Sequence, residues 1–429
     1  MTRTHRLATY TGVLLVTSAL TTAAPALGQD TAGVGMVRPD GDGERYWSRW
    51  RGPSGQGIVE GTGYPDTWSD TTNVRWKTAV PGTGHSSPIV WGDRIFLTTS
   101  RNGGRRVSIL SFRRSDGELL WETDAPEGRP EYTHNKNNPA SATVSTDGER
   151  VYASFGSRGM VAVDFDGSLV WHRDLGYIDN YHGPAGSPLL YRDTVIIYQD
   201  QNGGGFVIAL DARTGETRWR TDRSARVGWG TPIAITVGDH DELIVSSQQL
   251  VQSYDPTTGD ELWRCNGMLR EVIPTPVVGQ GLVFCTSGRA GPTLAIRPGG
   301  RGDVTDTHVE WKTTRGSPFV PSPVLFGDYL YTVNDMSSII TCLNAKTGET
   351  VWQERLGRPR REGISASPVV VDDKLFVTND DGETFVLRTG AEFELLHTND
   401  IGARTLASPA LVDGTWYIRT AGELIAIGN

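Results

Sequence analysis

Cysteine is scarce in this chain of 429 residues, and no two of its three cysteines are adjacent. No CxxC or CxxCH motif occurs, which argues against a zinc ribbon, a thioredoxin-type site and covalent c-type haem attachment. An oxidising compartment would allow a disulfide between Cys265 and Cys285. We favour free, buried thiols at Cys265, Cys285 and Cys342, because unpaired cysteine behaves as a small apolar residue in protein cores.

Long apolar runs are also missing, except near the N-terminus. There, Arg3 and Arg6 precede a short apolar stretch over residues 7–20, and Ala26-Leu-Gly28 offers small residues at a cleavage site. This pattern predicts a secretory signal peptide over residues 1–28, cleaved near Gly28-Gln29, and a mature protein in the periplasm or outside the cell. An uncleaved N-terminal helix is the alternative. We expect a protein that does not span the membrane.

Basic stripes and catalytic motifs are lacking as well. The chain has 41 Lys and Arg against 50 Asp and Glu, a net charge of −9, so nucleic-acid binding is not expected. The Gly203–Gly205 run does not precede a predicted helix and is therefore no phosphate loop. No G-x-S-x-G nucleophile motif occurs on a strand-to-helix turn. The stretch Asn379–Glu383 lacks the spacing of an EF-hand, so we predict a turn there and no metal site.

Glycine and tryptophan are abundant, with 52 and 13 copies, and they recur in a pattern. The stretch Ala209–Trp219 combines a short apolar strand, a Thr-Gly turn and a second strand that carries the tryptophan. The same spacing of glycine and tryptophan ends at Trp121, Trp171, Trp263 and Trp352. Self-similarity at a fixed period identifies a repeat architecture.

The repeats predict an all-β protein, an eight-bladed β-propeller of four-stranded antiparallel blades over residues 73–429. Successive tryptophans lie one blade length apart, and each can bury about 150–250 Å² between blades. The expected first strands open at Ser87, Ser141, Ser187, Thr231, Thr275, Ser322, Ser367 and Ser408. The tryptophans expected to dock neighbouring blades are Trp76, Trp121, Trp171, Trp219, Trp263, Trp311 and Trp352.

The ends of the repeat array predict how the ring closes. The eighth unit stops after three strands at Asn429, whereas the strand around Trp76 has no unit before it. We expect this N-terminal strand to complete the last blade, because that removes an open sheet edge. Two units depart from the pattern: the fifth has an insertion at Pro298–His308, and the seventh has Phe393–Leu396 where a tryptophan is expected.

Residues 29–72 form an N-terminal segment before the propeller. Its first part, to about residue 45, is rich in Gly and Asp and is expected to be disordered. Its second part, Trp47–Gly57, is too rich in Gly and Pro for a helix. We expect an ordered loop whose two tryptophans dock on the propeller; a ligand-stacking platform is the alternative.

The consensus Ala-x-Asp-x-x-Thr-Gly-x-x-x-Trp, most complete at Ala209–Trp219, resembles the repeat of PQQ-like, quinoprotein-type β-propellers over about residues 73–429. For the PQQ-dependent dehydrogenases, the resemblance implies adjacent cysteines over the quinone, Ca²⁺ held by carboxylate and amide side chains, and an Asp base. This chain has no adjacent cysteines and no cluster that matches those ligands. It is closer in kind to exported BamB-like propellers, non-catalytic periplasmic scaffolds of outer-membrane protein assembly. It lacks the lipobox cysteine that would imply a membrane tether.

The residues expected to contact a ligand lie in the loops that run from a fourth strand to the next first strand. In propellers of this type, those loops reach one face near the axis. Histidine, arginine and tryptophan together suit an anionic or planar ligand; the alternative is a set of ordinary solvated loop residues. The loop Tyr132–Pro139 is the most distinctive. The candidates are His85, His134, Lys136, Asn137, His182, Trp229, Arg270, Glu271, Arg361 and Arg404, with Ser317, Phe319 and Glu362 in the same loops.

We therefore predict a monomeric, non-catalytic binding or scaffold propeller of the bacterial cell envelope, without a cofactor. It would bind a protein or peptide partner, or a small ligand, on the axial loop face. The alternative is a PQQ-dependent oxidoreductase of alcohols or sugars that uses PQQ with calcium.

Overall fold

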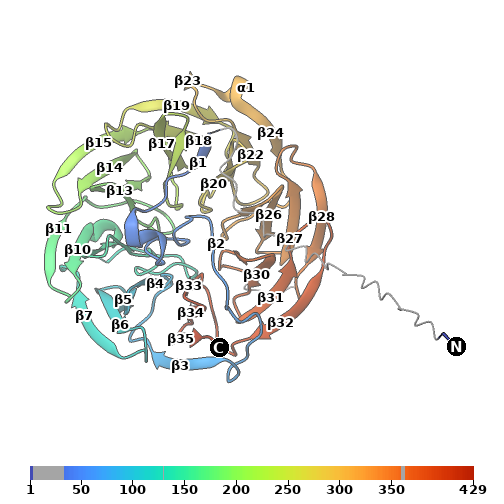
Figure 1. The fold of residues 1–429 in the computed structure, drawn as a ribbon. Helices are drawn as coiled ribbons and strands as arrows, with labels where there is room; N and C mark the ends of the chain where they lie inside the picture. The colour runs from blue at the N-terminus through green and yellow to red at the C-terminus, as the bar shows by residue number, and fades with distance from the viewer. Residues whose placement is uncertain (3–32, 129, 359–362) are drawn as a thin grey trace.

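The computed structural model describes residues 1–2, 33–128, 130–358 and 363–429, so the predicted signal peptide and its cleavage site lie outside the described residues. Eight sheets surround a central axis (Figure 1). In the described ranges, helix is limited to η1 (Gly41–Glu44), η2 (Gly156–Arg158) and α1 (Thr305–His308). The prediction of an all-β, eight-bladed propeller is confirmed.

Each blade is a meander of four main strands, which follow one another from the axis to the outside of the ring. Neighbouring main strands pair antiparallel, and the short strands reflect the tight Gly and Asp turns between them. The first three blades comprise β4 (Ile89–Trp91), β5 (Arg94–Arg101), β6 (Arg106–Arg113) and β7 (Leu119–Asp124); β8 (Ser145–Thr146), β9 (Arg150–Ser154), β10 (Met160–Asp164) and β11 (Leu169–Arg173); and β12 (Leu189–Tyr191), β13 (Thr194–Gln199), β14 (Gly205–Asp211) and β15 (Thr217–Arg223).

Blades 4 and 7 have extra strands. Blade 4 is joined by β1 (Val34–Met36) on its inner edge and by β23 (Gly302–Asp303) on its outer edge, and blade 7 is joined by β2 (Ile58–Val59). The main strands of blades 4 to 7 are β16 (Ile233–Val237), β17 (His240–Ser246), β18 (Leu250–Tyr254) and β19 (Glu261–Asn266); β20 (Val277–Gly279), β21 (Leu282–Thr286), β22 (Thr293–Ile296) and β24 (Val309–Thr313); β25 (Val324–Phe326), β26 (Tyr329–Asn334), β27 (Ile339–Asn344) and β28 (Thr350–Arg355); and β29 (Val369–Val371), β30 (Lys374–Thr378), β31 (Glu383–Arg388) and β32 (Leu395–Asp400).

Blade 8 closes the ring with strands from both ends of the chain. It consists of β33 (Ala410–Val412), β34 (Thr415–Arg419), β35 (Glu423–Ile427) and β3 (Val74–Ala79). The N-terminal strand β3 pairs antiparallel with β35, with Trp76 opposite Ala426 (Figure 1). The predicted closure is therefore confirmed.

A tryptophan on the outermost strand of most blades binds the next blade. The Trp219 Nε1–H, for example, donates to the carbonyl oxygen of Pro256 at 3.0 Å, and the indole covers Gly259. A Cβ on Gly259 would lie 2.4 Å from the ring, and its φ of +78° also favours glycine. Equivalent indole-to-carbonyl bonds of 2.9–3.1 Å are made by Trp76, Trp121, Trp171, Trp311 and Trp352.

Two blades depart from this arrangement. Trp263 donates instead to the buried Glu242 carboxylate of its own blade, at 2.7 Å, where the insertion at 298–308 replaces the usual turn. In blade 7, the expectation that Phe393–Leu396 takes the tryptophan position was wrong. The residue at that register is His397, opposite Val386, and its Nε2 lies 2.7 Å from the Asp66 carbonyl oxygen. The space between blades 7 and 8 is filled by Trp68 of the N-terminal segment.

The N-terminal segment, residues 34–68, is ordered and crosses the inner strands (Figure 1). This differs from the expectation of disorder up to about residue 45, because β1 pairs with β16 from Val34 to Met36. Backbone N–H groups of inner strands donate to the segment: Val90 to the Trp47 carbonyl, Thr146 to Ser48 and Val370 to Gly57. The segment thereby covers free strand edges that water or another chain would otherwise contact.

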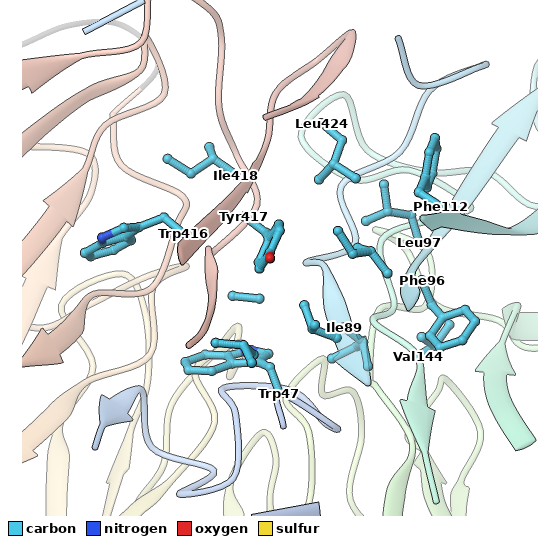
Figure 2. Packing of buried hydrophobic residues seen from close by; sticks show 14 of the residues in the cluster. Trp47, Ile89, Phe96, Leu97, Phe112, Val144, Trp416, Tyr417, Ile418 and Leu424 are labelled. Carbon is cyan, nitrogen blue, oxygen red and sulfur yellow. The ribbon is translucent and has the colours of Figure 1, made fainter. Parts of the chain in front are cut away.

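The two predicted docking tryptophans of this segment lie against the propeller. Trp47 is 2% exposed and belongs to the same buried cluster as Tyr417 of blade 8 and Ile89 of blade 1 (Figure 2). The Trp50 Nε1–H donates to Thr275 Oγ1 at 3.0 Å. Arg51 is also buried and donates to the Pro323 carbonyl at 2.7 Å, and its burial lowers its pKa to about 9. The segment is therefore held at the axis by aromatic packing and by guanidinium-to-carbonyl bonds.

A ring of hydroxyl groups surrounds the axis where the first strands begin. In seven steps, the backbone N–H of one Ser or Thr donates to the hydroxyl of the equivalent residue in the next blade, at 2.9–3.3 Å. Between blades 8 and 1, Arg419 donates to Ser86 Oγ at 2.6 Å instead. In blade 2 the ring residue is Thr143, two positions after the predicted Ser141. We call this set the hydroxyl ring: Ser87, Thr143, Ser187, Thr231, Thr275, Ser322, Ser367 and Ser408.

The three cysteines are buried and free, and no Cys265–Cys285 disulfide is present. Burial raises the pKa of Cys265 to about 11 and that of Cys342 to about 12. Both thiols are therefore protonated at neutral pH and unreactive as nucleophiles.

Closure of the ring by β3 makes a stability prediction. Replacing Trp76 with alanine should lower the free energy of unfolding by about 3 kcal/mol, because it removes a large side chain from the junction between blades. Lys77→Ala, on the exposed face of the same strand, is the matched control and should have little effect. Denaturant unfolding followed by tryptophan fluorescence measures both; equal stability of the two variants would contradict the closure of the ring through Trp76.

Candidate functional site

The axis opens into a cavity of about 200 Å³ on the side of the hydroxyl ring opposite the N-terminal segment. Its lining includes one residue from every blade, each two positions before a hydroxyl-ring residue. The N-terminal segment contacts ring residues and residues that follow them in the sequence, whereas the cavity is lined by residues that precede them. The segment and the cavity therefore lie on opposite sides of the ring. We call this cavity the axial pocket; its eight repeated positions are His85, Ser141, Ala185, Trp229, Ile273, Val320, Ser365 and Leu406.

The loop between blades 1 and 2 forms one wall of the axial pocket. Asn137 Nδ2 donates to the carbonyls of His182 and Gly183, at 2.8 and 3.1 Å, which ties this loop to the next one. The backbone N–H of Lys136 donates to His134 Nδ1 at 3.2 Å. A neutral His134 therefore carries its proton on Nε2. The loop is held by its own hydrogen bonds, so the pocket wall is preformed.

Aromatic rings cluster beside this wall. His182 lies 4.9 Å from His134, 4.5 Å from Tyr181 and 5.4 Å from Trp229, measured between ring centroids. The Trp229 Nε1–H donates to the Gly183 carbonyl at 2.9 Å, which fixes the plane of the indole. The cluster offers a rigid aromatic surface with few polar atoms left to satisfy, suited to an apolar or aromatic group.

Burial keeps His85 and His182 of the pocket neutral. The pKa of His85 falls to about 4, first through burial and then through the nearby Arg419 and Arg404. Burial also lowers the pKa of His182, although Glu271 opposes the shift. At neutral pH both imidazoles are therefore donors and acceptors of hydrogen bonds without a charge.

Lys136 supplies a positive charge at the axis, in contact with the buried Asp380 and within electrostatic range of the buried Asp335. Its Nζ lies 3.4 Å from Asp380 Oδ2, which also accepts a hydrogen bond from Ser365 Oγ at 3.1 Å. Burial raises the pKa of Asp380, and it raises that of Asp335 to about 6. The charge of Lys136 is thus largely balanced on the side of blades 6 and 7.

A second cavity, the side pocket, adjoins the axial pocket over blades 3 to 5. It has a volume of about 510 Å³. Glu271 separates the two cavities: it contacts His182 at 3.6 Å and forms an ion pair with Arg289, and both of these residues line the axial pocket. The side pocket is lined by Tyr181, Asn202, Arg226, Val227, Gln248, Gln249, Met268, Leu269, Arg270 and Glu271.

The structure places the sequence-predicted site residues in three groups. Arg270 and Glu271 line the side pocket. Arg404 is exposed and acts on the pKa of His85 from outside the lining, and Arg361 lies outside the described residues. The axial pocket brings together His85, His134, Lys136, Asn137, His182 and Trp229.

Sequence reasoning missed residues that come from a second set of loops. The loops between second and third strands emerge on the same face as the loops between blades, and they supply Arg289, Asp335 and Asp380. Because successive strands alternate in direction, the sequence was sufficient to predict that both sets of loops lie on this face. It could not indicate which of their side chains point inward. The turn predicted at Asn379–Glu383 is present, and Asp380 within it points toward Lys136.

The lining of the axial pocket does not match the quinone and calcium site that the dehydrogenase resemblance implies. Ca²⁺ takes six to eight oxygen ligands, whereas the lining here holds no carboxylate and has two cations, Lys136 and Arg289, among imidazole, aromatic and aliphatic groups. In the described part of the chain, no three Asp, Glu, His or Cys side chains are arranged so that they could hold a metal ion. None of the three cysteines lines the pocket.

The pKa of His85 predicts a dependence of stability on pH. Because its folded pKa of about 4 lies below the unfolded value of 6.5, protons favour the unfolded state. The stability is intact above pH 6.5 and falls as the pH drops toward 4, by at most about 3 kcal/mol. His85→Gln should lack this loss, so its stability relative to wild type should rise between pH 7 and pH 4.5. Denaturant unfolding measures the free energy of unfolding of both proteins. A difference between them that stays constant across that pH range would contradict the burial of a neutral His85.

Comparison with known proteins relates this sequence and its fold to a family. The family model described as outer membrane protein assembly factor BamB matches residues 67–264, 108–354 and 203–428. BamB of Burkholderia pseudomallei (strain K96243) is 25% identical over 264 residues, covering 59% of this chain and 62% of that protein, so the match spans less than two thirds of the relative's length. No helix among the described residues is long and apolar enough to cross a bilayer.

Solved structures agree on the fold. BamB from Moraxella catarrhalis has a TM-score of 0.59 at 15% identity, covering 82% of this chain and 98% of that one. The quinohemoprotein alcohol dehydrogenase from Comamonas testosteroni has a TM-score of 0.65 at 12% identity, covering 90% and 81%. At these identities the likeness concerns the fold alone. Because the family model matches most of the sequence, this chain belongs to the PQQ-like β-propeller family described as outer membrane protein assembly factor BamB.

Proposed function

We propose that this protein is an exported, non-catalytic scaffold of the bacterial cell envelope that acts in outer-membrane protein assembly. It binds a protein partner through the face that carries the axial and side pockets. Membership of the BamB family supports the cellular role, and the predicted signal peptide supports export.

The observation that carries the proposal is the difference between the two faces. The N-terminal segment occupies inner-strand edges on one face, whereas the opposite face has the axial pocket surrounded by exposed apolar residues. Tyr132 is 70% exposed, Tyr181 40% and Leu269 52%. Exposed aromatic and apolar side chains around a concave, partly aromatic surface are typical of interaction sites.

Site-specific photocrosslinking tests this face. A photoreactive phenylalanine analogue at Tyr181 or Leu269 should form a covalent adduct with an envelope protein in cells of the source organism. Arg213 is the control position, because it is exposed in a turn between third and fourth strands and therefore lies on the opposite face. Equal adducts from Arg213 and Tyr181, or none from either axial position, would contradict the proposal.

Cofactor binding separates this proposal from the oxidoreductase alternative. Because the pocket lacks a calcium-type ligand set, titration with PQQ and CaCl₂, followed by absorbance and calorimetry, should give no tight binding. The protein should also fail to reduce an artificial dye with alcohols or sugars. Stoichiometric PQQ binding together with dye reduction would overturn the scaffold proposal.

A further inference from the structure

The side pocket carries two arginines without an acidic partner. Arg226 and Arg270 are both exposed, and neither forms a salt bridge with any residue that the structure describes. The acid in the lining, Glu271, is already paired with Arg289 and lies next to His182. The side pocket therefore has an excess of positive charge, although the whole chain has a net charge of −9.

The rest of the lining suits a peptide backbone and not only an anion. Gln248 and Gln249 bring amide groups that can both donate and accept hydrogen bonds, as an extended backbone requires. Leu269 is 52% exposed at the same pocket. The guanidinium groups of arginine can bind carboxylates through two parallel hydrogen bonds. A segment lying here would bring acidic side chains to Arg226 and Arg270.

The two pockets are neighbours that share a wall. Tyr181 lines the side pocket and lies 5.3 Å from Trp229 of the axial pocket, between ring centroids. Its neighbour His182 faces the axial pocket. With about 200 Å³ of space, the axial pocket has room for one aromatic side chain. An extended chain that passes over this wall can engage both pockets.

We propose that the axial and side pockets together bind an extended peptide segment in which an aromatic residue is flanked by acidic residues. The aromatic side chain enters the axial pocket against Trp229 and His182, and the carboxylates pair with Arg226 and Arg270. This inference rests on the proposed function, because it specifies the chemistry of the partner segment. A basic peptide would meet uncompensated positive charge in the side pocket.

Fluorescence polarisation with the full mature chain tests the proposal. The probe is a fluorescein-labelled nonapeptide with a central phenylalanine flanked by aspartates. Two matched peptides replace the aspartates with lysine or the phenylalanine with alanine. The aspartate–phenylalanine peptide should bind about tenfold more tightly than either, and added salt should weaken it, since exposed ion pairs are screened.

Variants of the protein assign the binding to the two pockets. The double variant R226E/R270E should lose about tenfold in affinity for the acidic peptide, whereas R226K/R270K should retain most of it. Arg213→Glu, on the opposite face, is the matched control for charge. Leu406→Trp should narrow the axial pocket and weaken the phenylalanine peptide without affecting its alanine counterpart. Thermal melts verify that each variant is folded.

Three outcomes would overturn the inference: equal binding of the aspartate and lysine peptides, unchanged affinity in the folded R226E/R270E variant, or an equal loss in Arg213→Glu. If these occur while Tyr181 still crosslinks to an envelope protein, only the peptide chemistry fails and the scaffold function stands. If crosslinking from the axial face also fails, the proposed function fails with it.

Discussion

The propeller depends on an indole that packs across the junction between blades. A four-stranded sheet exposes two apolar faces, and it can bury both only between two similar sheets. The tryptophan of the outer strand covers the glycine turn of the next blade and donates its N–H to a carbonyl there. Each buried indole contributes about 4–6 kcal/mol of gross transfer free energy, an upper bound because the unfolded chain is already partly compact. The glycines follow from the same contact, because a Cβ would lie 2.4–2.8 Å from the ring at Gly117, Gly167, Gly215, Gly259 and Gly348.

The hydroxyl ring divides the axis into two unlike ends. On one side, the N-terminal segment satisfies inner-strand N–H groups and places Trp47, Trp50 and Arg51 at the axis. On the other side, residues two positions before the ring are left to line a cavity. This position contributes little to docking between blades, so packing does not require the same residue there in every repeat. His85, Trp229 and Leu406 occupy equivalent places with unrelated chemistry, which is how a repetitive fold acquires a specific surface.

The repeat made the fold predictable, including blade number and closure by β3, because glycine turns and tryptophans recur at one spacing. Departures from the repeat were harder to predict. His397 occupies a tryptophan position in blade 7, because the space between blades 7 and 8 is filled by Trp68. That residue lies more than 300 positions earlier in the sequence. The order of residues 34–45 depends on pairing with β16, a long-range contact that a Gly- and Asp-rich composition does not reveal. The loops between blades indicated much of the axial lining, whereas Arg289 and Asp380 come from hairpin loops whose side-chain directions depend on the folded ring.

The central claim is that the axial face binds a partner while the N-terminal segment stays docked on the other face. Hydrogen–deuterium exchange, with and without the aspartate–phenylalanine nonapeptide, tests it most directly. Binding should slow amide exchange in residues 132–141, 177–186, 226–230 and 268–273, and leave residues 47–58 unchanged. Slower exchange confined to residues 47–58 or to the outer strands, with none in the axial loops, would contradict the account.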